Sequence, residues 1–216
     1  MRRSQPEGYL AIPNSGQGPG VLVLHAWWGL NHTIKSVCDR LAQAGFTAYA
    51  PDLYHGRIAQ TIEEAENLSG EAESEPIKAD ITAAVDFLSQ QAVTADGKLG
   101  VIGFSFGAYF ALELAVDMPE RIRAVTLFYG TGDADCAGSQ AAYLGHFAAQ
   151  DDYEPAEFVD QLEASLKAPG RPVTFHRYPD AGHWFFEPDR PDAYNQAAAE
   201  LAWERTVVFL KDMLLS

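Results

Sequence analysis

A serine between two glycines is the residue of this 216-residue chain whose type and setting most clearly indicate chemistry. Ser105 lies in Gly103-Phe-Ser-Phe-Gly107, directly after an apolar run and directly before a stretch with apolar residues at helical spacing. A strand that turns sharply into a helix holds a serine hydroxyl up as a nucleophile, and glycines at the flanking positions avoid collisions with neighbouring backbone. We interpret Ser105 as a nucleophile; the alternative is a glycine-bracketed turn with an idle serine.

An acid and a histidine follow this serine in an informative order. Asp151 and Asp152 come directly after one apolar run, and His183 follows the next through the loop Pro-Asp-Ala-Gly-His. The order Ser, Asp, His is that of the α/β-hydrolase fold. In such a triad the histidine takes the proton of the serine, and the carboxylate holds the imidazole tautomer and stabilises the imidazolium. Spacing alone leaves both aspartates open.

Two further acids follow an earlier apolar run, in Gly-Thr-Gly-Asp-Ala-Asp. Asp133 and Asp135 are therefore alternative partners for the histidine. Loop carboxylates of this kind more often cap or turn the backbone, so we rank both below Asp151 and Asp152.

The loops after the strands also suggest an oxyanion hole and a pocket. Backbone N–H groups of Trp27 and Phe106 are the expected donors to a developing oxyanion. Consecutive tryptophans cannot both face one core, so at least one is expected at the site, and an aromatic pocket lined by Trp28, Trp184 and Phe185 is predicted. Alternation along the chain leaves open that one aromatic residue after His183 lies in the core.

Apolar strands alternate with amphipathic helices along the whole chain. This pattern predicts an α/β fold with a mostly parallel sheet covered on both faces, no large lid, and a single domain over residues 1–216. Residues 9–12 are expected to add an antiparallel edge strand, and residues 63–75 to form a solvated helix or cap-like excursion. Strands are predicted at 21–25, 46–50, 99–103, 124–129, 143–148 and 173–178, and helices at 32–44, 77–90, 106–116, 155–166 and 193–214.

Composition sets the class of protein and of partner. The chain has 15 basic and 30 acidic residues, a net charge of −15, which argues against nucleic acid or an anionic membrane as partner. No run is long and apolar enough to span a bilayer, and Arg2 and Arg3 precede no apolar leader segment. Two cysteines are too few for a disulfide framework. We expect a cytoplasmic monomer or small homo-oligomer.

Histidine spacing argues against a metal hydrolase, and the serine chemistry needs no cofactor. No pair has the H-E-x-x-H arrangement, and His25 is interpreted as a structural, hydrogen-bonded residue. The remaining histidines outside the predicted triad are His32, His55, His146 and His176.

The chain resembles the dienelactone hydrolases of the α/β-hydrolase superfamily. The matching stretches are VLVLHAWWGLN, RLAQAGFTAYAPDLYHG, KLGVIGFSFGA, YLGHFAAQDDYEP, FHRYPDAGHWFF and AAAELAWERTVVFL, spread from about residue 20 to residue 214. The resemblance implies an esterase or lactonase with Ser105, Asp151 and His183 as its triad, and it is what selects Asp151 over Asp152.

The departures from the family bear on substrate. Members known for dienelactone use a cysteine where this chain has Ser105, and a glutamate where it has Ala26. The arginines that bind the substrate carboxylate in the family have no clear counterpart: Glu187 stands where one is expected, and none lies between Arg57 and Arg121. We therefore expect a carboxylate-bearing lactone to meet negative charge.

The function predicted from sequence is hydrolysis of a small neutral ester or lactone through an acyl-enzyme. An acyltransferase or peptidase could use the same triad. A catalytically silent scaffold that binds a small hydrophobic ligand or a protein is the alternative from another class, because fold does not fix function.

Overall fold

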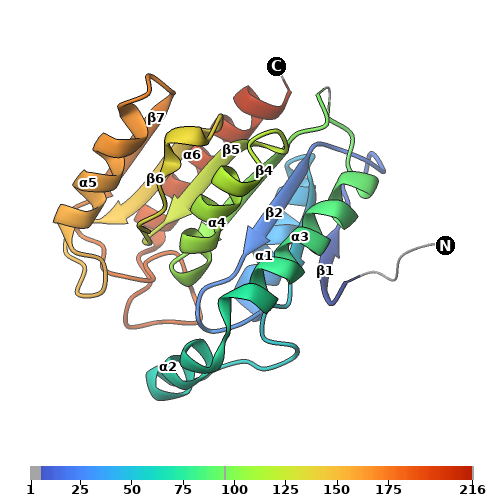
Figure 1. Ribbon diagram of the computed structural model, residues 1–216. Helices are drawn as coiled ribbons and strands as arrows, with labels where there is room; N and C mark the ends of the chain where they lie inside the picture. Colours follow the sequence, from blue (N-terminus) through green and yellow to red (C-terminus); the bar gives the residue numbers. More distant parts are fainter. Residues whose placement is uncertain (1–5, 95, 216) are drawn as a thin grey trace.

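A mixed β-sheet forms the centre of the structure (Figure 1). The computed structural model describes residues 6–94 and 96–215. Within these residues, seven strands lie in the order β1-β3-β2-β4-β5-β6-β7. Their bounds are β1 (Gly8–Ala11), β2 (Gly20–Leu24), β3 (Thr47–Pro51), β4 (Leu99–Phe104), β5 (Ile122–Phe128), β6 (Ala142–Ala148) and β7 (Val173–Tyr178).

Neighbouring strands pair in parallel, except that β1 is antiparallel to β3. The predicted α/β-hydrolase fold is confirmed, including the antiparallel edge strand near residue 9. The inner strands β2, β3, β4 and β6 are buried throughout, as strands covered on both faces are, whereas the edge strand β7 is partly exposed and carries polar residues.

Helices cover both faces of this sheet (Figure 1). Helices α1 (His32–Gln43) and α6 (Gln196–Leu214) pack on one face; α3 (Ser74–Gln91), α4 (Phe106–Asp117) and α5 (Ala156–Lys167) pack on the other. Successive strand side chains point to opposite faces, so Val23 joins the first core cluster and Leu24 the second. The last helix begins later than the expected residue 193, because Asn195 caps it by accepting from the Ala198 N–H.

Helix α2 (Ile62–Glu71) projects from the edge of the sheet at which the parallel strands end (Figure 1). Thr61 and Glu64 form a capping box at its start, each side chain accepting from the other residue's backbone N–H. The excursion expected over residues 63–75 is therefore a short helix that ends at Glu71, followed directly by α3.

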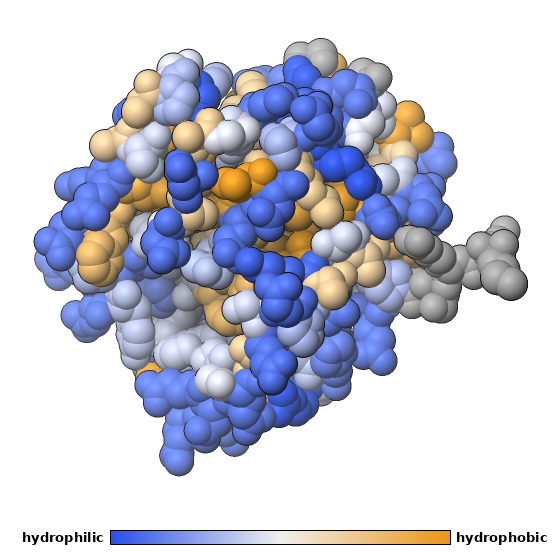
Figure 2. Space-filling view, in the orientation of Figure 1, coloured by the Kyte–Doolittle hydropathy of each residue, from blue (hydrophilic) through white to orange (hydrophobic). Residues whose placement is uncertain are grey.

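The surface agrees with the acidic composition. Hydrophilic side chains cover most of the face seen in Figure 2, with hydrophobic ones showing between them. Among the described residues, no helix combines the length and the apolar character that crossing a membrane requires. Arg2 and Arg3, on which the expectation about a leader rests, lie outside the described residues.

The turn from β4 into α4 has no space for side chains at its two glycines. A Cβ on Gly107 would lie 2.3 Å from the carbonyl oxygen of Leu24, and a Cβ on Gly103 would lie 2.5 Å from the carbonyl oxygen of Gly107. Between them Ser105 has a φ of 48°, which L-residues rarely adopt. Larger residues at Gly103 or Gly107 would therefore collide with neighbouring backbone, as predicted from the sequence.

Replacing Gly107 tests this constraint. Gly107→Ala is expected to lower the free energy of unfolding by about 1–3 kcal/mol, because the added methyl meets backbone that cannot rotate away. Gly70→Ala is the control: it lies in α2 with nothing within 4 Å of the new Cβ, and should be neutral or gain up to about 1 kcal/mol. Urea unfolding followed by circular dichroism measures both, and equal stability of the two variants would contradict the close packing.

Candidate active site

Ser105, His183 and Asp151 form a continuous chain of hydrogen bonds. Ser105 Oγ lies 3.0 Å from His183 Nε2, and His183 Nδ1 lies 2.9 and 2.8 Å from the two carboxylate oxygens of Asp151. The three residues follow β4, β7 and β6, so the parallel sheet delivers them to one edge. With Nδ1–H donated to the carboxylate, Nε2 is left to accept the serine proton.

Asp151 is held in place by the backbone that follows it. The N–H groups of Tyr153 and Glu154 donate to its Oδ1, at 2.9 and 3.0 Å. The side chains of His183 and Asp151 are 6% and 3% exposed, so water screens their interaction little. Asp152 is exposed instead. The two lower-ranked acids are also exposed: Asp133 and Asp135.

Two backbone amides next to the serine have no partner among the described residues. The N–H of Phe106 opens α4, and the N–H of Trp27 follows β2, the strand whose end contacts α4 at Gly107; neither donates to another group. The positive end of the α4 dipole lies at the same place. Both amides are therefore available to an acceptor, as an oxyanion hole requires.

Aromatic side chains surround His183. The ring centroid of Tyr153 lies 5.1 Å from that of His183, and Tyr153 is 47% exposed. Trp184 packs against Trp27 and Trp28, with centroid distances of 5.9 and 5.2 Å. Tyr153 was not among the residues predicted from sequence, although its place two residues after Asp151 is a usable signal.

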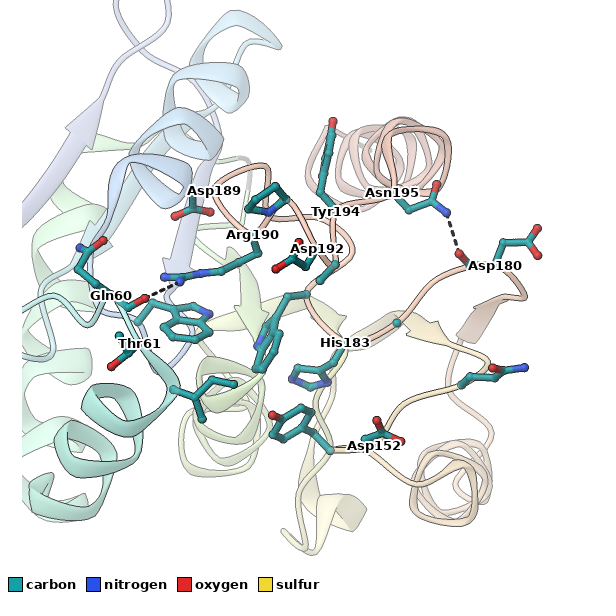
Figure 3. A pocket seen from close by; sticks show the side chains of 18 residues that line it. Gln60, Thr61, Asp152, Asp180, His183, Asp189, Arg190, Asp192, Tyr194 and Asn195 are labelled. Atoms are coloured by element: carbon teal, nitrogen blue, oxygen red, sulfur yellow. Dashed lines mark hydrogen bonds between the residues drawn. The ribbon is translucent and has the colours of Figure 1, made fainter.

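A cavity of about 720 Å³ opens beside this cluster (Figure 3). His183, Trp28 and Trp184 are in its wall, and Ser105 is not, so the cavity meets the triad at the histidine. Its volume lies in the range of small-molecule sites. Four aspartates also line it: Asp152, Asp180, Asp189 and Asp192.

The arginine in the described wall of the cavity is already engaged. The Arg190 guanidinium lies 3.5 Å from the centroid of the Trp28 ring and donates to the carbonyl oxygens of Gln60 and Ala59, at 3.0 and 3.4 Å (Figure 3). Its Nε is buried without a partner among the described residues. Arg190 thus ties the loop before α2 to the loop after His183, and the accessible charges of the cavity are carboxylates. This role of Arg190 was not predicted from sequence, because it depends on how the loop before α2 and the loop after His183 lie next to each other.

Phe185 does not line the cavity, which corrects the prediction. Trp184 has a φ of 62° and turns the chain directly after His183. Phe185 consequently points into the core, fully buried between Tyr129 and Tyr178 at centroid distances of 5.5 and 5.0 Å.

Glu187 is also buried, and it does not present charge to a ligand. It is fully inaccessible, one carboxyl oxygen accepts from the Tyr129 hydroxyl at 2.9 Å, and the other has no partner among the described residues. Burial raises the pKa of Glu187 to about 8, opposed by the hydrogen bond from Tyr129. The negative charge expected at this position comes from the cavity aspartates.

His25 and the cysteines have no chemical role in this geometry. The His25 ring donates to the Ala26 carbonyl at 2.7 Å and accepts from the Leu53 N–H at 3.2 Å, and burial lowers its pKa. Cys38 and Cys136 are buried, and burial raises the pKa of both thiols, which disfavours the reactive thiolate.

Comparison with known proteins shows the family of this chain. Residues 7–214 match the sequence model of the dienelactone hydrolase family. The chain belongs to this family. It is similar to "Protein usf" of Aquifex pyrophilus, with 34% identity over 96% of this chain and 93% of the relative. It is also 32% identical to an Aquifex aeolicus (strain VF5) protein named "Putative carboxymethylenebutenolidase", with the same coverage.

A solved structure has the same fold. The fold superposes, with a TM-score of 0.81 and 25% identity, on a dienelactone hydrolase-like promiscuous phosphotriesterase from metagenomic libraries, covering 93% of this chain and 89% of that one. Membership in the dienelactone hydrolase family makes the chain a hydrolase, with small esters or lactones as its class of substrate.

The buried Glu187 predicts an unusual pH dependence of stability. Between the ordinary glutamate pKa of 4.5 and the folded value of about 8, the unfolded chain releases this proton while the folded chain keeps it. The folded state then binds more protons, so this residue's contribution to stability falls as pH rises through that window. Glu187→Gln removes the titration. The melting temperature of the variant should rise relative to wild type between pH 5 and pH 8, and a constant difference would contradict the burial of a neutral acid.

Proposed function

We propose that this chain is a serine hydrolase that cleaves small carboxylic esters or lactones through an acyl-enzyme on Ser105. The observation that carries the proposal is the hydrogen-bonded chain from Ser105 Oγ to His183 Nε2, at 3.0 Å, and from His183 Nδ1 to Asp151, at 2.8 Å. A serine hydroxyl is a weak nucleophile by itself, and this geometry supplies the base that it needs.

The acylation step follows from these positions. His183 Nε2 takes the hydroxyl proton as Ser105 Oγ bonds to the carbonyl carbon, and the carbonyl electron pair moves onto oxygen. The N–H groups of Trp27 and Phe106 donate to that oxyanion. When the carbonyl reforms, the bond to the alkoxy oxygen breaks, and the leaving alcohol takes the proton from His183. Asp151 stabilises the imidazolium between these events.

Deacylation repeats the sequence with water. His183 Nε2 accepts a proton from water as its oxygen bonds to the acyl carbon, and then returns that proton to Ser105 Oγ as the ester bond breaks. The products are the free acid and the original serine. In a lactone the leaving alkoxide is part of the acyl group, so one hydroxy acid is released.

The cavity favours neutral substrates over anionic ones. Trp28, Trp184 and Tyr153 offer aromatic contact, and the charges open to a ligand are those of aspartates such as Asp152 and Asp192. Arg190 is committed to Trp28 and to backbone carbonyls. An ester or lactone without a carboxylate therefore fits the wall best.

Turnover of p-nitrophenyl acetate tests the proposed reaction. Ser105→Ala should reduce the rate to background, and Asp151→Asn should lower kcat on the order of 10⁴-fold, because the imidazole loses its orienting acceptor. Asp152→Asn, the neighbouring acid in the sequence, should lose no more than a few-fold. A diisopropyl fluorophosphate adduct located by peptide mass spectrometry should lie on Ser105, and iodoacetamide should leave the rate unchanged.

Three outcomes would overturn the proposal. Wild type that is no faster than Ser105→Ala would favour a silent scaffold. Loss of activity with labelling at Cys38 or Cys136 would move the nucleophile to a thiol. Preferred transfer of the acyl group to an alcohol or amine, measured by product ratio in mixed solvent, would favour an acyltransferase.

The charge of the cavity predicts a substrate order. Among phenyl esters whose acyl chains end in a methyl, a carboxylate or a trimethylammonium group, the carboxylate should have the lowest kcat/KM. One aspartate about 4 Å from the charge of the ligand, with both in contact with bulk water, corresponds to about 1 kcal/mol, or roughly fivefold. Asp192→Asn should lower the ratio of kcat/KM for the methyl ester to kcat/KM for the carboxylate ester by about that factor. Addition of 0.5 M salt should lower the same ratio, because salt screens the charge. A carboxylate ester that reacts fastest would contradict this reading of Arg190.

A further inference from the structure

Glu187 is a costly residue at its position. It is fully buried, it has one hydrogen-bond partner, and its second carboxyl oxygen has none among the described residues. A buried polar atom without a partner costs free energy that an apolar side chain of the same size would not. Packing of the fold therefore gives no reason for a carboxyl group at this position. The hydrogen bond that Glu187 accepts from Tyr129 is the contact that can explain it.

That contact leads to the histidine of the proposed triad. Tyr129, fully buried at the end of β5, donates its hydroxyl to Glu187, and its ring centroid lies 5.1 Å from that of His183. Its backbone has a φ of 38° and its N–H donates to the His146 carbonyl at 2.8 Å, so the residue is fixed at its base. The hydrogen bond to Glu187 fixes the other end of the ring.

We propose that Glu187, through its hydrogen bond with Tyr129, is a positioning residue for His183. This inference rests on the proposed function of the triad and adds to it. Asp151 fixes the imidazole at one edge through Nδ1, whereas the Tyr129 ring supports its face, and the Glu187 carboxyl keeps that ring from rotating. Small displacements of a general base reduce the rate strongly, because attack needs the reacting atoms close and aligned.

The charges near this pair define its pH dependence. Within the loop of Glu187, Asp189 raises the pKa of the Glu187 carboxyl and Arg190 lowers it. Burial raises the pKa of Tyr129, and the charges of Glu187, Asp189 and Asp151 raise it further. In the neutral range Glu187 is the protonated acid and accepts from Tyr129 through one oxygen. Above pH 8 it becomes a buried anion at the hydroxyl of Tyr129, which adds an inflection near that pH to the rate profile.

Kinetics of a four-member set test the inference. Glu187→Met and Tyr129→Phe should each lower kcat for p-nitrophenyl acetate about tenfold with KM within about twofold, an estimate from the sensitivity of rate to alignment. The double variant should lose the same tenfold rather than a hundredfold, because both changes break one interaction. Glu187→Gln keeps the acceptor and should restore kcat to within about threefold, without the inflection near pH 8.

A matched pair elsewhere controls for generic effects. Tyr109 donates to Glu113 at 3.1 Å on α4, away from the cavity. Tyr109→Phe and Glu113→Met should change kcat less than about twofold. Melting temperatures of all variants separate loss of fold from loss of position. If Glu187→Met does not fold, Tyr129→Phe and Glu187→Gln still decide the result.

Failure of this inference is distinct from failure of the proposed function. Unchanged kcat in folded Tyr129→Phe and Glu187→Met, or a hundredfold loss in the double variant, overturns the positioning role while the triad stands. If wild type has no serine-dependent turnover, the NMR chemical shifts of the His183 ring replace kinetics: Tyr129→Phe should change them more than Tyr109→Phe does, and equal shifts in the two variants overturn the inference.

Discussion

The contact between Gly107 and the end of β2 is the constraint on which the site depends. Because a Cβ on Gly107 would lie 2.3 Å from the Leu24 carbonyl oxygen, the first turn of α4 lies directly on the backbone that leads to Trp27. At this turn Ser105 has a φ of 48°, and the backbone amides of Trp27 and Phe106 have no hydrogen-bond partner among the described residues. The proposed nucleophile turn and the proposed oxyanion hole thus both depend on one packing contact.

Asp151 and His183 reach the turn at Ser105 on loops that are fixed in different ways. Asp151 is held by local backbone bonds from the residues just after it, so its position depends on the loop after β6 alone. His183 contacts groups distant in sequence: its Nδ1 bonds to the Asp151 carboxylate, and its ring centroid lies 5.1 Å from that of Tyr129. Changes in the loop between β7 and α6 therefore affect the base more readily than the acid.

Local pattern predicted the strands, the helices and the order of the triad, because burial on two faces and the turn at Ser105 leave direct traces in sequence. The side chains around the triad could not be predicted in the same way. Phe185 was predicted at the pocket from its place beside His183, and alternation left open only that one aromatic residue there lies in the core; the positive φ of Trp184 turns the chain, and both Phe185 and Phe186 are buried. The stacking of Arg190 on Trp28 joins two loops 162 residues apart, and no periodicity encodes such a pairing.

A charge at a motif position does not have a fixed role. Glu187 occupies the place at which the family resemblance leads one to expect an arginine that binds the substrate carboxylate. From its charge alone, Glu187 would be expected to repel that carboxylate. Burial changes the outcome: the pKa of the carboxyl rises to about 8, so the group is neutral at pH 7 and accepts one hydrogen bond. The cavity aspartates are exposed, so salt can screen their proposed effect on an anionic substrate, whereas the proposed effect of Glu187 on His183 passes through the packing of Tyr129.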